Sequence, residues 1–142
     1  MKVIDLQKVS RETDLRCSEH FLLSEFLRTD TGFVNDDIDS SIYSNLCLLC
    51  HLVLEPMRLY IGDIPLSVTS GYRSAAVNAA VGGVPNSYHR FGLAVDVSAA
   101  VGVDDMIEFL YIQKDNLYAR GLDLRFVHYV DRYFIHVQLS SL

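Results

Sequence analysis

Residues 87–96 read Ser87-Tyr88-His89-Arg90-Phe91-Gly92-Leu93-Ala94-Val95-Asp96, a polar loop that runs into an apolar strand. His89 and Asp96 can approach each other only if the chain turns back between them. Gly92 is best suited to that turn, because glycine adopts left-handed backbone conformations without steric strain. A carboxylate inside an apolar strand is costly to bury unless it is paired or bound to a metal ion. The stretch therefore predicts a loop that delivers His89, a turn at Gly92 and a carboxylate with a strong partner.

A second histidine, His136, lies in another apolar strand near the C-terminus. Alternate residues of a strand share a face, so His136 and Gln138 lie together, away from their apolar neighbours, and can line a cleft. Two histidines and one carboxylate without a fourth protein ligand are typical of a catalytic zinc site, whereas structural zinc sites have four protein ligands. Two alternatives remain: a hydrogen-bonded structural histidine, and a simple salt bridge between Asp96 and Arg73.

Working outward, the chain alternates helical and strand patterns without an internal repeat or a linker. A helix is expected over about 39–60, and Pro56 should kink or shorten it, because proline removes a helical hydrogen bond. The other expected elements are a strand at 64–69, a helix at 74–81 stopped by Gly82-Gly83, a strand at 93–97, a helix from Asp104 as its cap to about 115, and strands at 124–130 and 133–139. The pattern predicts a single α+β domain with a small antiparallel sheet and flanking helices.

Composition narrows the function classes. The chain has 142 residues, half of them hydrophobic, which suits one domain with a real core; we expect a loosely attached polar segment at 1–20 and the domain at 21–142. A net charge of −6 argues against a nucleic-acid-binding protein, and no apolar run is long enough for a membrane span. The first residues lack the apolar stretch of a secretory signal, so synthesis in the cytoplasm without a signal peptide is expected.

The three cysteines are an odd set and do not predict a disulfide framework. Cys47-Leu48-Leu49-Cys50-His51 matches the haem-attachment pattern, but it lies within an apolar helical stretch. In such a setting cysteine behaves as a small hydrophobic residue. We therefore expect neither haem nor a second metal site there.

Four segments of the chain carry a resemblance to a known family. They are Ser70-Gly71-Tyr72-Arg73-Ser74, Asn78 with Val81-Gly82-Gly83, the stretch from Ser87 to Asp96, and Phe134-Ile135-His136. With them the chain resembles the zinc D-Ala-D-Ala carboxypeptidases of the VanX/VanY type, a family that also includes phage L-alanyl-D-glutamate endopeptidases. The resemblance covers about residues 20–139.

The resemblance implies a Hedgehog/DD-peptidase-like fold and a Zn²⁺ ion held by His89, Asp96 and His136. Arg73 would bind a substrate oxygen or the developing oxyanion, and Ser87 would help to hold the substrate. The implied activity is hydrolysis of a peptide bond in peptidoglycan stem peptides by a monomer, as a D,D-carboxypeptidase or an endopeptidase. A phage or prophage lysin that reaches the cell wall after release is the implied setting.

The general base departs from the family pattern. Many members have an acidic residue three positions before the last zinc histidine, where this chain has Tyr133; others have His-x-Asp, where this chain has Gln138. Asp131 and His128 are the remaining candidates. A two-residue turn at Asp131-Arg132 would place His128 on the face opposite His136, and a three-residue turn would place the two histidines side by side. A homologue that binds metal or cell-wall peptide without turnover is therefore the alternative function.

Overall fold

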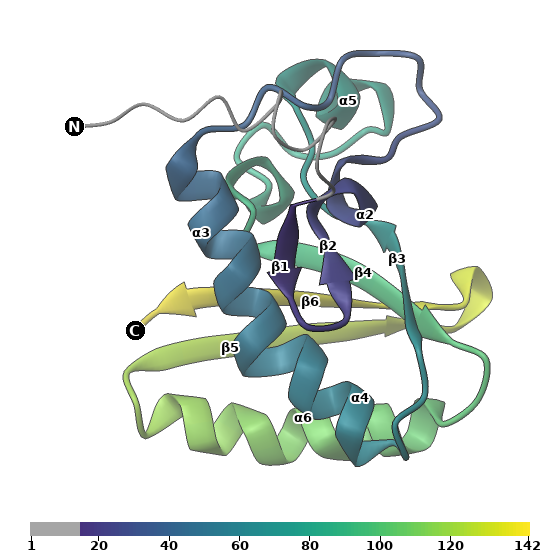
Figure 1. Cartoon of the computed structure of the whole chain (residues 1–142), viewed down its shortest axis with the longest axis vertical. Coiled ribbons are helices and arrows are strands. Elements are labelled where there is room, and N and C mark those ends of the chain that lie inside the picture. The colour runs from purple at the N-terminus through teal and green to yellow at the C-terminus, as the bar shows by residue number, and fades with distance from the viewer. Residues whose placement is uncertain (1–14) are drawn as a thin grey trace.

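The computed structural model describes residues 15–142, which form one α+β domain, as the sequence predicts (Figure 1). The elements follow one another as β1 (Arg16–Ser18), β2 (Phe21–Leu22), α2 (Leu23–Leu27), α3 (Ser40–Leu49), the π-helical η1 (Cys50–Leu54), α4 (Glu55–Tyr60), β3 (Leu66–Ser70), α5 (Ala75–Ala80), the 3-10 turn η2 (Tyr88–Phe91), β4 (Ala94–Ala99), α6 (Val103–Tyr118), β5 (Leu122–Tyr129), the 3-10 turn η3 (Val130–Arg132) and β6 (Phe134–Ser141). None of the helices in this part of the chain is both long and apolar enough to cross a bilayer.

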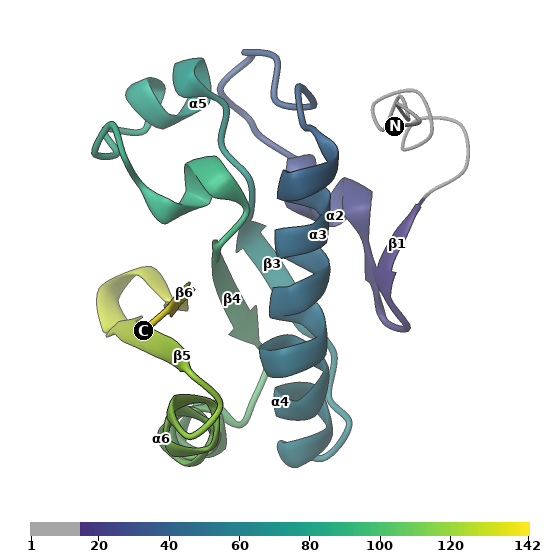
Figure 2. The same ribbon diagram turned by 90° about the vertical axis from the view of Figure 1, so that its left-hand side faces the viewer.

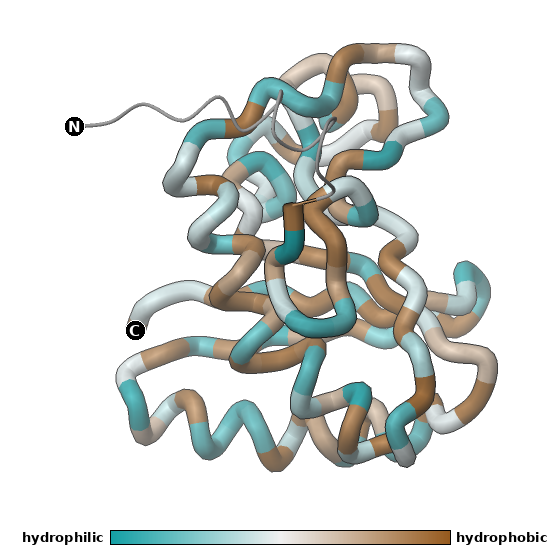
Figure 3. Tube along the Cα trace, viewed as in Figure 1, coloured by the Kyte–Doolittle hydropathy of each residue, from teal (hydrophilic) through white to brown (hydrophobic). Residues whose placement is uncertain are grey.

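The main sheet has four antiparallel strands in the order β3-β4-β6-β5, and a separate two-stranded hairpin joins β1 and β2. The long helix formed by α3, η1 and α4 runs across one side of the sheet, and α6 lies beside β5 (Figures 1 and 2). Apolar residues gather where the strands face the helices, while α6 alternates between apolar and polar positions (Figure 3). The opposite side of β4 and β6 is left for the polar side chains of the site.

The long helix contains Pro56 without ending there. Proline has no N–H, so the carbonyl of Leu52 loses its helical partner. The side chain of Gln113 on α6 replaces that partner and donates from Nε2 to the Leu52 carbonyl over 2.6 Å. The π-helical turn at Cys50–Leu54 lies immediately before the proline. The expected kink is thus accommodated by a widened turn and a side-chain hydrogen bond, and the helix continues to Tyr60.

The hairpin between β5 and β6 differs from the tight turn expected at Asp131-Arg132. Tyr129 pairs with Phe134, so four residues connect the strands, and Val130–Arg132 forms a 3-10 turn. Tyr133 closes the connection with a left-handed backbone, φ +60°. A four-residue connection has the parity of a two-residue turn, and Val127 therefore lies opposite His136.

Two details at element ends differ from expectation. Gly102, with φ +88°, precedes α6, so Asp104 lies in the first turn of the helix rather than at its cap. The carboxylate there still favours the positive end of the helix dipole. Residues 1–14 lie outside the described part of the chain, but Cys17 and Ser18 of the expected loose segment are buried against the domain through β1.

Candidate metal centre

Gly92 brings His89 next to Asp96. His89 lies in the 3-10 turn η2, and Gly92 follows that turn with a left-handed backbone, φ +70°. A Cβ atom on Gly92 would lie 2.8 Å from the carbonyl oxygen of Ile42 on α3, so there is no room for a side chain. The chain reverses at this glycine and enters β4, where Asp96 pairs with His136 of β6. Loop, turn and sheet register together place the three side chains on one side of the sheet.

The ligand atoms of His89, Asp96 and His136 all lie within 4.8 Å of one another. Asp96 Oδ1 lies 3.4 Å from His89 Nε2 and 2.8 Å from His136 Nδ1. Ligands at the usual zinc bond length of about 2.0–2.1 Å in a tetrahedron are separated by about 3.3 Å. The three atoms therefore fit a Zn²⁺ ion with small shifts, and a fourth position faces the cleft.

Burial and hydrogen bonds determine the protonation of the triad, which consists of His89, Asp96 and His136. Burial by itself would raise the pKa of Asp96, but hydrogen bonds from His136 and His89 outweigh it and hold the pKa at about 2. For His136, burial favours the neutral ring, yet its hydrogen bonds to Asp96 and Gln138 raise its pKa above the ordinary value. The carboxylate is thus ionised at neutral pH, as a metal ligand must be.

Further contacts orient His89 and Asp96. His89 Nδ1 lies 2.7 Å from the carbonyl oxygen of Gly71, so Nδ1 carries the proton and Nε2 is left for a metal ion. Gly71 packs so closely on Phe26 that a Cβ atom would lie 2.6 Å from its backbone. Asp96 Oδ2 lies 3.6 Å from Arg73 Nη2, and Arg73 Nε donates to Ser70 Oγ. The salt bridge that offered the alternative to a metal site is therefore present beside the triad.

The triad lies in a cleft of about 510 Å³ between the α5–η2 segment and the strands. The lining residues are Arg73, Val81, Gly82, Gly83, Val84, Asn86, Ser87, Tyr88, His89, Asp96, Tyr129, Arg132, Phe134, His136 and Gln138. Ser87 accepts from the backbone N–H of His89 and leaves its hydroxyl proton for another partner. Asp96 is the one carboxylate among these lining residues. The cleft thus combines a metal-binding group, guanidinium groups and a hydroxyl.

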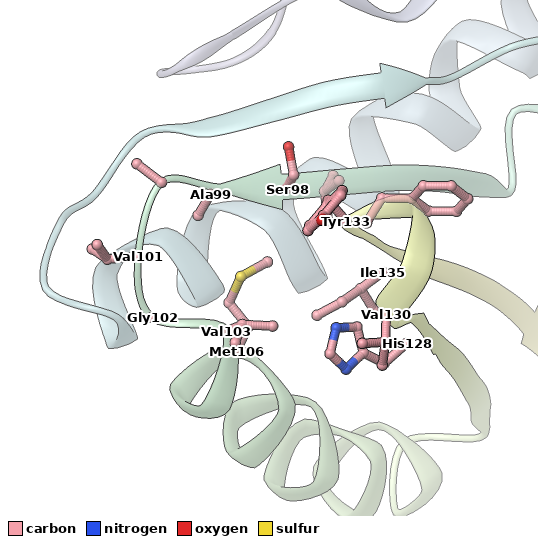
Figure 4. A pocket seen from close by; sticks show the side chains of 13 residues that line it. Ser98, Ala99, Val101, Gly102, Val103, Met106, His128, Val130, Tyr133 and Ile135 are labelled. Atoms are coloured by element: carbon pink, nitrogen blue, oxygen red, sulfur yellow. The ribbon is translucent and has the colours of Figure 1, made fainter.

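The two candidates for the general base lie elsewhere. Asp131 is exposed in η3 and does not line the cleft. His128 pairs with Ile135, on the face opposite His136, and it points into an apolar pocket beside Met106 of α6 (Figure 4). Tyr133 is 84% exposed at the hairpin tip. The structure therefore separates both candidates from the triad.

The sequence did not indicate that Arg132 lines the cleft, and it did not indicate the hydrogen bond between Gln138 and His136. Arg132 was considered only as part of a turn, and its place in the cleft depends on the four-residue connection of the hairpin. Gln138 was placed on the face of His136, but its hydrogen bond to that ring was not predicted. Strand alternation was the signal that could have indicated this contact.

Comparison with known proteins gives two matches. The family model for peptidase M15 matches residues 19–138. The zinc D-Ala-D-Ala carboxypeptidase of Streptomyces albus G is 31% identical over 80 residues. That match covers 56% of this chain and 31% of the relative, so the chain corresponds to less than a third of that protein's length.

Proposed function

Since this chain belongs to the peptidase M15 family, we propose that it is a zinc-dependent peptidase that hydrolyses a bond in peptidoglycan stem peptides. The observation that carries the proposal is the convergence of His89, Asp96 and His136 beside Arg73 at the base of a cleft. The name of the Streptomyces relative supports the same chemistry.

Zn²⁺ is the cofactor that suits this site. Imidazole nitrogens and one carboxylate oxygen are typical zinc ligands, and three protein ligands leave a position for substrate or water. A bound Zn²⁺ supplies a Lewis acid that polarises the scissile carbonyl and makes water nucleophilic at neutral pH. His89, Asp96 and His136 hold the ion in this proposal.

Arg73 and Ser87 act on the substrate. The Arg73 guanidinium is largely buried, and Asp96 and Ser70 fix two of its nitrogens. Its Nη1 has no hydrogen-bond partner within residues 15–142, so it can donate to a substrate carboxylate or to the developing oxyanion. The hydroxyl of Ser87, two residues before His89, can donate to a substrate carbonyl. These two residues orient the peptide over the metal position.

The cleft also supports a second candidate function, a homologue that binds metal or cell-wall peptide without turnover. The observation that favours it is the lining of the cleft, whose single carboxylate is Asp96 itself. In the enzyme proposal, the base is Asp131, which lies outside the cleft but directly precedes Arg132, one of the lining residues. Zinc-dependent hydrolysis that disappears in Asp131→Asn supports the enzyme; zinc binding without hydrolysis supports the binding protein.

The test of the main proposal compares the wild type with His89→Ala, and uses His51→Ala as a matched control. His51 is an exposed histidine of η1, away from the triad. We expect about one zinc per chain in the wild type and in His51→Ala and none in His89→Ala. Hydrolysis of muropeptides must follow the zinc content. Equal hydrolysis by His89→Ala would refute the proposal.

The products identify the bond. A carboxypeptidase releases free D-alanine and leaves the sacculus intact, whereas an endopeptidase that cuts stem peptides or their cross-links solubilises it. We propose that the protein acts at the cell wall, and the role of a phage or prophage endolysin is the finer form of that proposal. Loss of turbidity of purified sacculi supports an endolysin. Release of D-alanine without loss of turbidity contradicts it.

A further inference from the structure

Both ring nitrogens of His136 contact side chains, whereas Nδ1 of His89 contacts a backbone carbonyl. Its Nδ1 lies 2.8 Å from Asp96 Oδ1, and its Nε2 lies 3.0 Å from Oε1 of Gln138. Both contacts come from side chains on the same side of the sheet. They approach opposite edges of the imidazole ring, so together they determine its plane.

The chemistry of the ring assigns the proton. A neutral imidazole has one N–H and one lone pair, and a metal ion takes the lone pair. Nδ1 is the His136 nitrogen that lies 2.8 Å from Asp96 Oδ1, so it faces the metal position. Nε2 must then carry the proton, and an amide oxygen, which can only accept, is a suitable partner. The geometry of Gln138 is therefore that of an acceptor for His136 Nε2–H.

We propose that Gln138 is a positioning residue that holds His136 as the Nε2–H tautomer and so directs its Nδ1 lone pair at the metal. The proposal rests on the proposed function, because it takes Zn²⁺ as the ion at the site. Gln138 thus orients a ligand, and as a neutral amide it does not accept a proton from water. His89 and the Gly71 carbonyl form the equivalent arrangement on the other side of the metal position.

The backbone of Gln138 does not depend on its side chain. In β6 it pairs with Ala94 of β4 on one side and with Arg125 of β5 on the other. The side chain is half-buried and lines the cleft, so its replacement leaves the strand in place. Substitutions at this position therefore test the hydrogen bond to His136 rather than the fold.

Two variants of the full chain separate shape from hydrogen bonding. Gln138→Leu keeps the approximate size of the side chain and removes the acceptor, while Gln138→Glu keeps an acceptor. Gln113→Leu on α6 is the matched control, since it removes another side-chain hydrogen bond of a glutamine, far from the cleft. Loss of the partner of a metal-binding histidine typically weakens metal affinity about 10–100-fold. We expect this loss in Gln138→Leu and near wild-type affinity in Gln138→Glu and Gln113→Leu.

Zinc affinity is measured by competition with a chromophoric chelator, and the tautomer by ¹⁵N NMR of the histidine rings in the zinc-loaded protein. In the wild type and in Gln138→Glu, the His136 ring should show a metal-bound Nδ1 and a protonated Nε2 whose hydrogen exchanges slowly. In Gln138→Leu that hydrogen should exchange faster. A role in packing alone would not change this signal.

The outcomes separate the two proposals. Unchanged zinc affinity and unchanged Nε2–H exchange in Gln138→Leu, with a wild type that binds zinc, overturn the role of Gln138 and leave the proposed function standing. A metal-bound Nε2 in the wild type also overturns it, because the amide oxygen would then face no proton. A wild type that binds no zinc overturns both proposals.

Discussion

Replacing Asp96 with asparagine should remove a stabilising charge from the metal-free protein, and the size of the effect follows from the pKa. The carboxyl of Asp96 is almost fully buried, and its pKa lies at about 2, below the ordinary value of 3.8. One pKa unit corresponds to about 1.4 kcal/mol, so the ionised carboxylate contributes about 2 kcal/mol to the free energy of unfolding. Asparagine cannot supply it.

The sign of the pH dependence is determined by the depressed pKa. The stabilisation is present above the ordinary pKa of an unfolded aspartate and disappears as the pH falls through the folded value. The difference in unfolding free energy between wild type and Asp96→Asn should therefore shrink by about 2 kcal/mol between about pH 5 and about pH 2. The contribution of His136 to the unfolding free energy has the opposite pH dependence: its raised pKa gives stability at acidic pH that is lost as the pH rises through that pKa.

Urea unfolding of chelator-treated protein, followed by circular dichroism across this pH range, measures the difference. Asp115→Asn, which removes an exposed carboxylate of α6, controls for the change in net charge. A constant difference between wild type and Asp96→Asn from about pH 5 to about pH 2 would refute the reasoning, since it would show that Asp96 has no special stabilisation in the folded state.

Three further substitutions test how the fold supports the site. Gly92→Ala should destabilise the protein by at least about 1–2 kcal/mol, through the left-handed backbone and the clash with Ile42, and it should also weaken zinc binding; thermal unfolding and a zinc titration measure both. Gln113→Leu should cost about 1–3 kcal/mol by leaving the Leu52 carbonyl without a partner, while zinc affinity stays unchanged; urea unfolding at neutral pH measures this cost. Burial would raise the pKa of Glu55, but the hydrogen bonds that it accepts from the β1–β2 hairpin lower it, so Glu55→Gln should cost about 1.5–3 kcal/mol at neutral pH. That cost should fade as the pH falls below about 4.5, and urea unfolding at several pH values would reveal any failure to do so.

The α+β class and the positions of the main helices and strands could be predicted because they depend on local patterns. Strand alternation placed Ile135 in the core and His136 on the other face, and the structure agrees. The turn at Gly92 was predictable because the backbone there needs a glycine. The extent of the helix over about 39–60 was also predicted, but the hydrogen bond from Gln113 to the Leu52 carbonyl beside Pro56 was not, since Gln113 lies far along the chain.

The identity of the general base is a feature of the site that local sequence patterns do not predict. Whether His128 or Asp131 approaches the triad depends on the length and backbone of a single hairpin, and four residues with a left-handed Tyr133 connect its strands. This connection turns His128 toward α6, leaves Asp131 exposed and brings Arg132 into the cleft. No short motif specifies the length of this connection, because a two-residue turn and a four-residue turn place the same strand residues opposite each other. The candidate metal ligands are less sensitive to the hairpin tip, because the pairing of β4 with β6 places Asp96 beside His136 whatever the conformation of the tip.

The hydrogen bonds of the triad imply that the site is largely organised before a metal ion arrives. Asp96 already joins both histidines, and the Gly71 carbonyl holds the ring of His89. His89, Asp96 and His136 would hold a metal ion without being assembled from separate positions, and His136 Nδ1 would give up its hydrogen. Metal uptake should consequently release protons and weaken at acidic pH, while the backbone around the cleft changes little. Preorganisation of this kind reduces the entropy lost on metal binding. The remaining requirement is the position of the proton on His136, and the Gln138 amide oxygen favours that proton on Nε2.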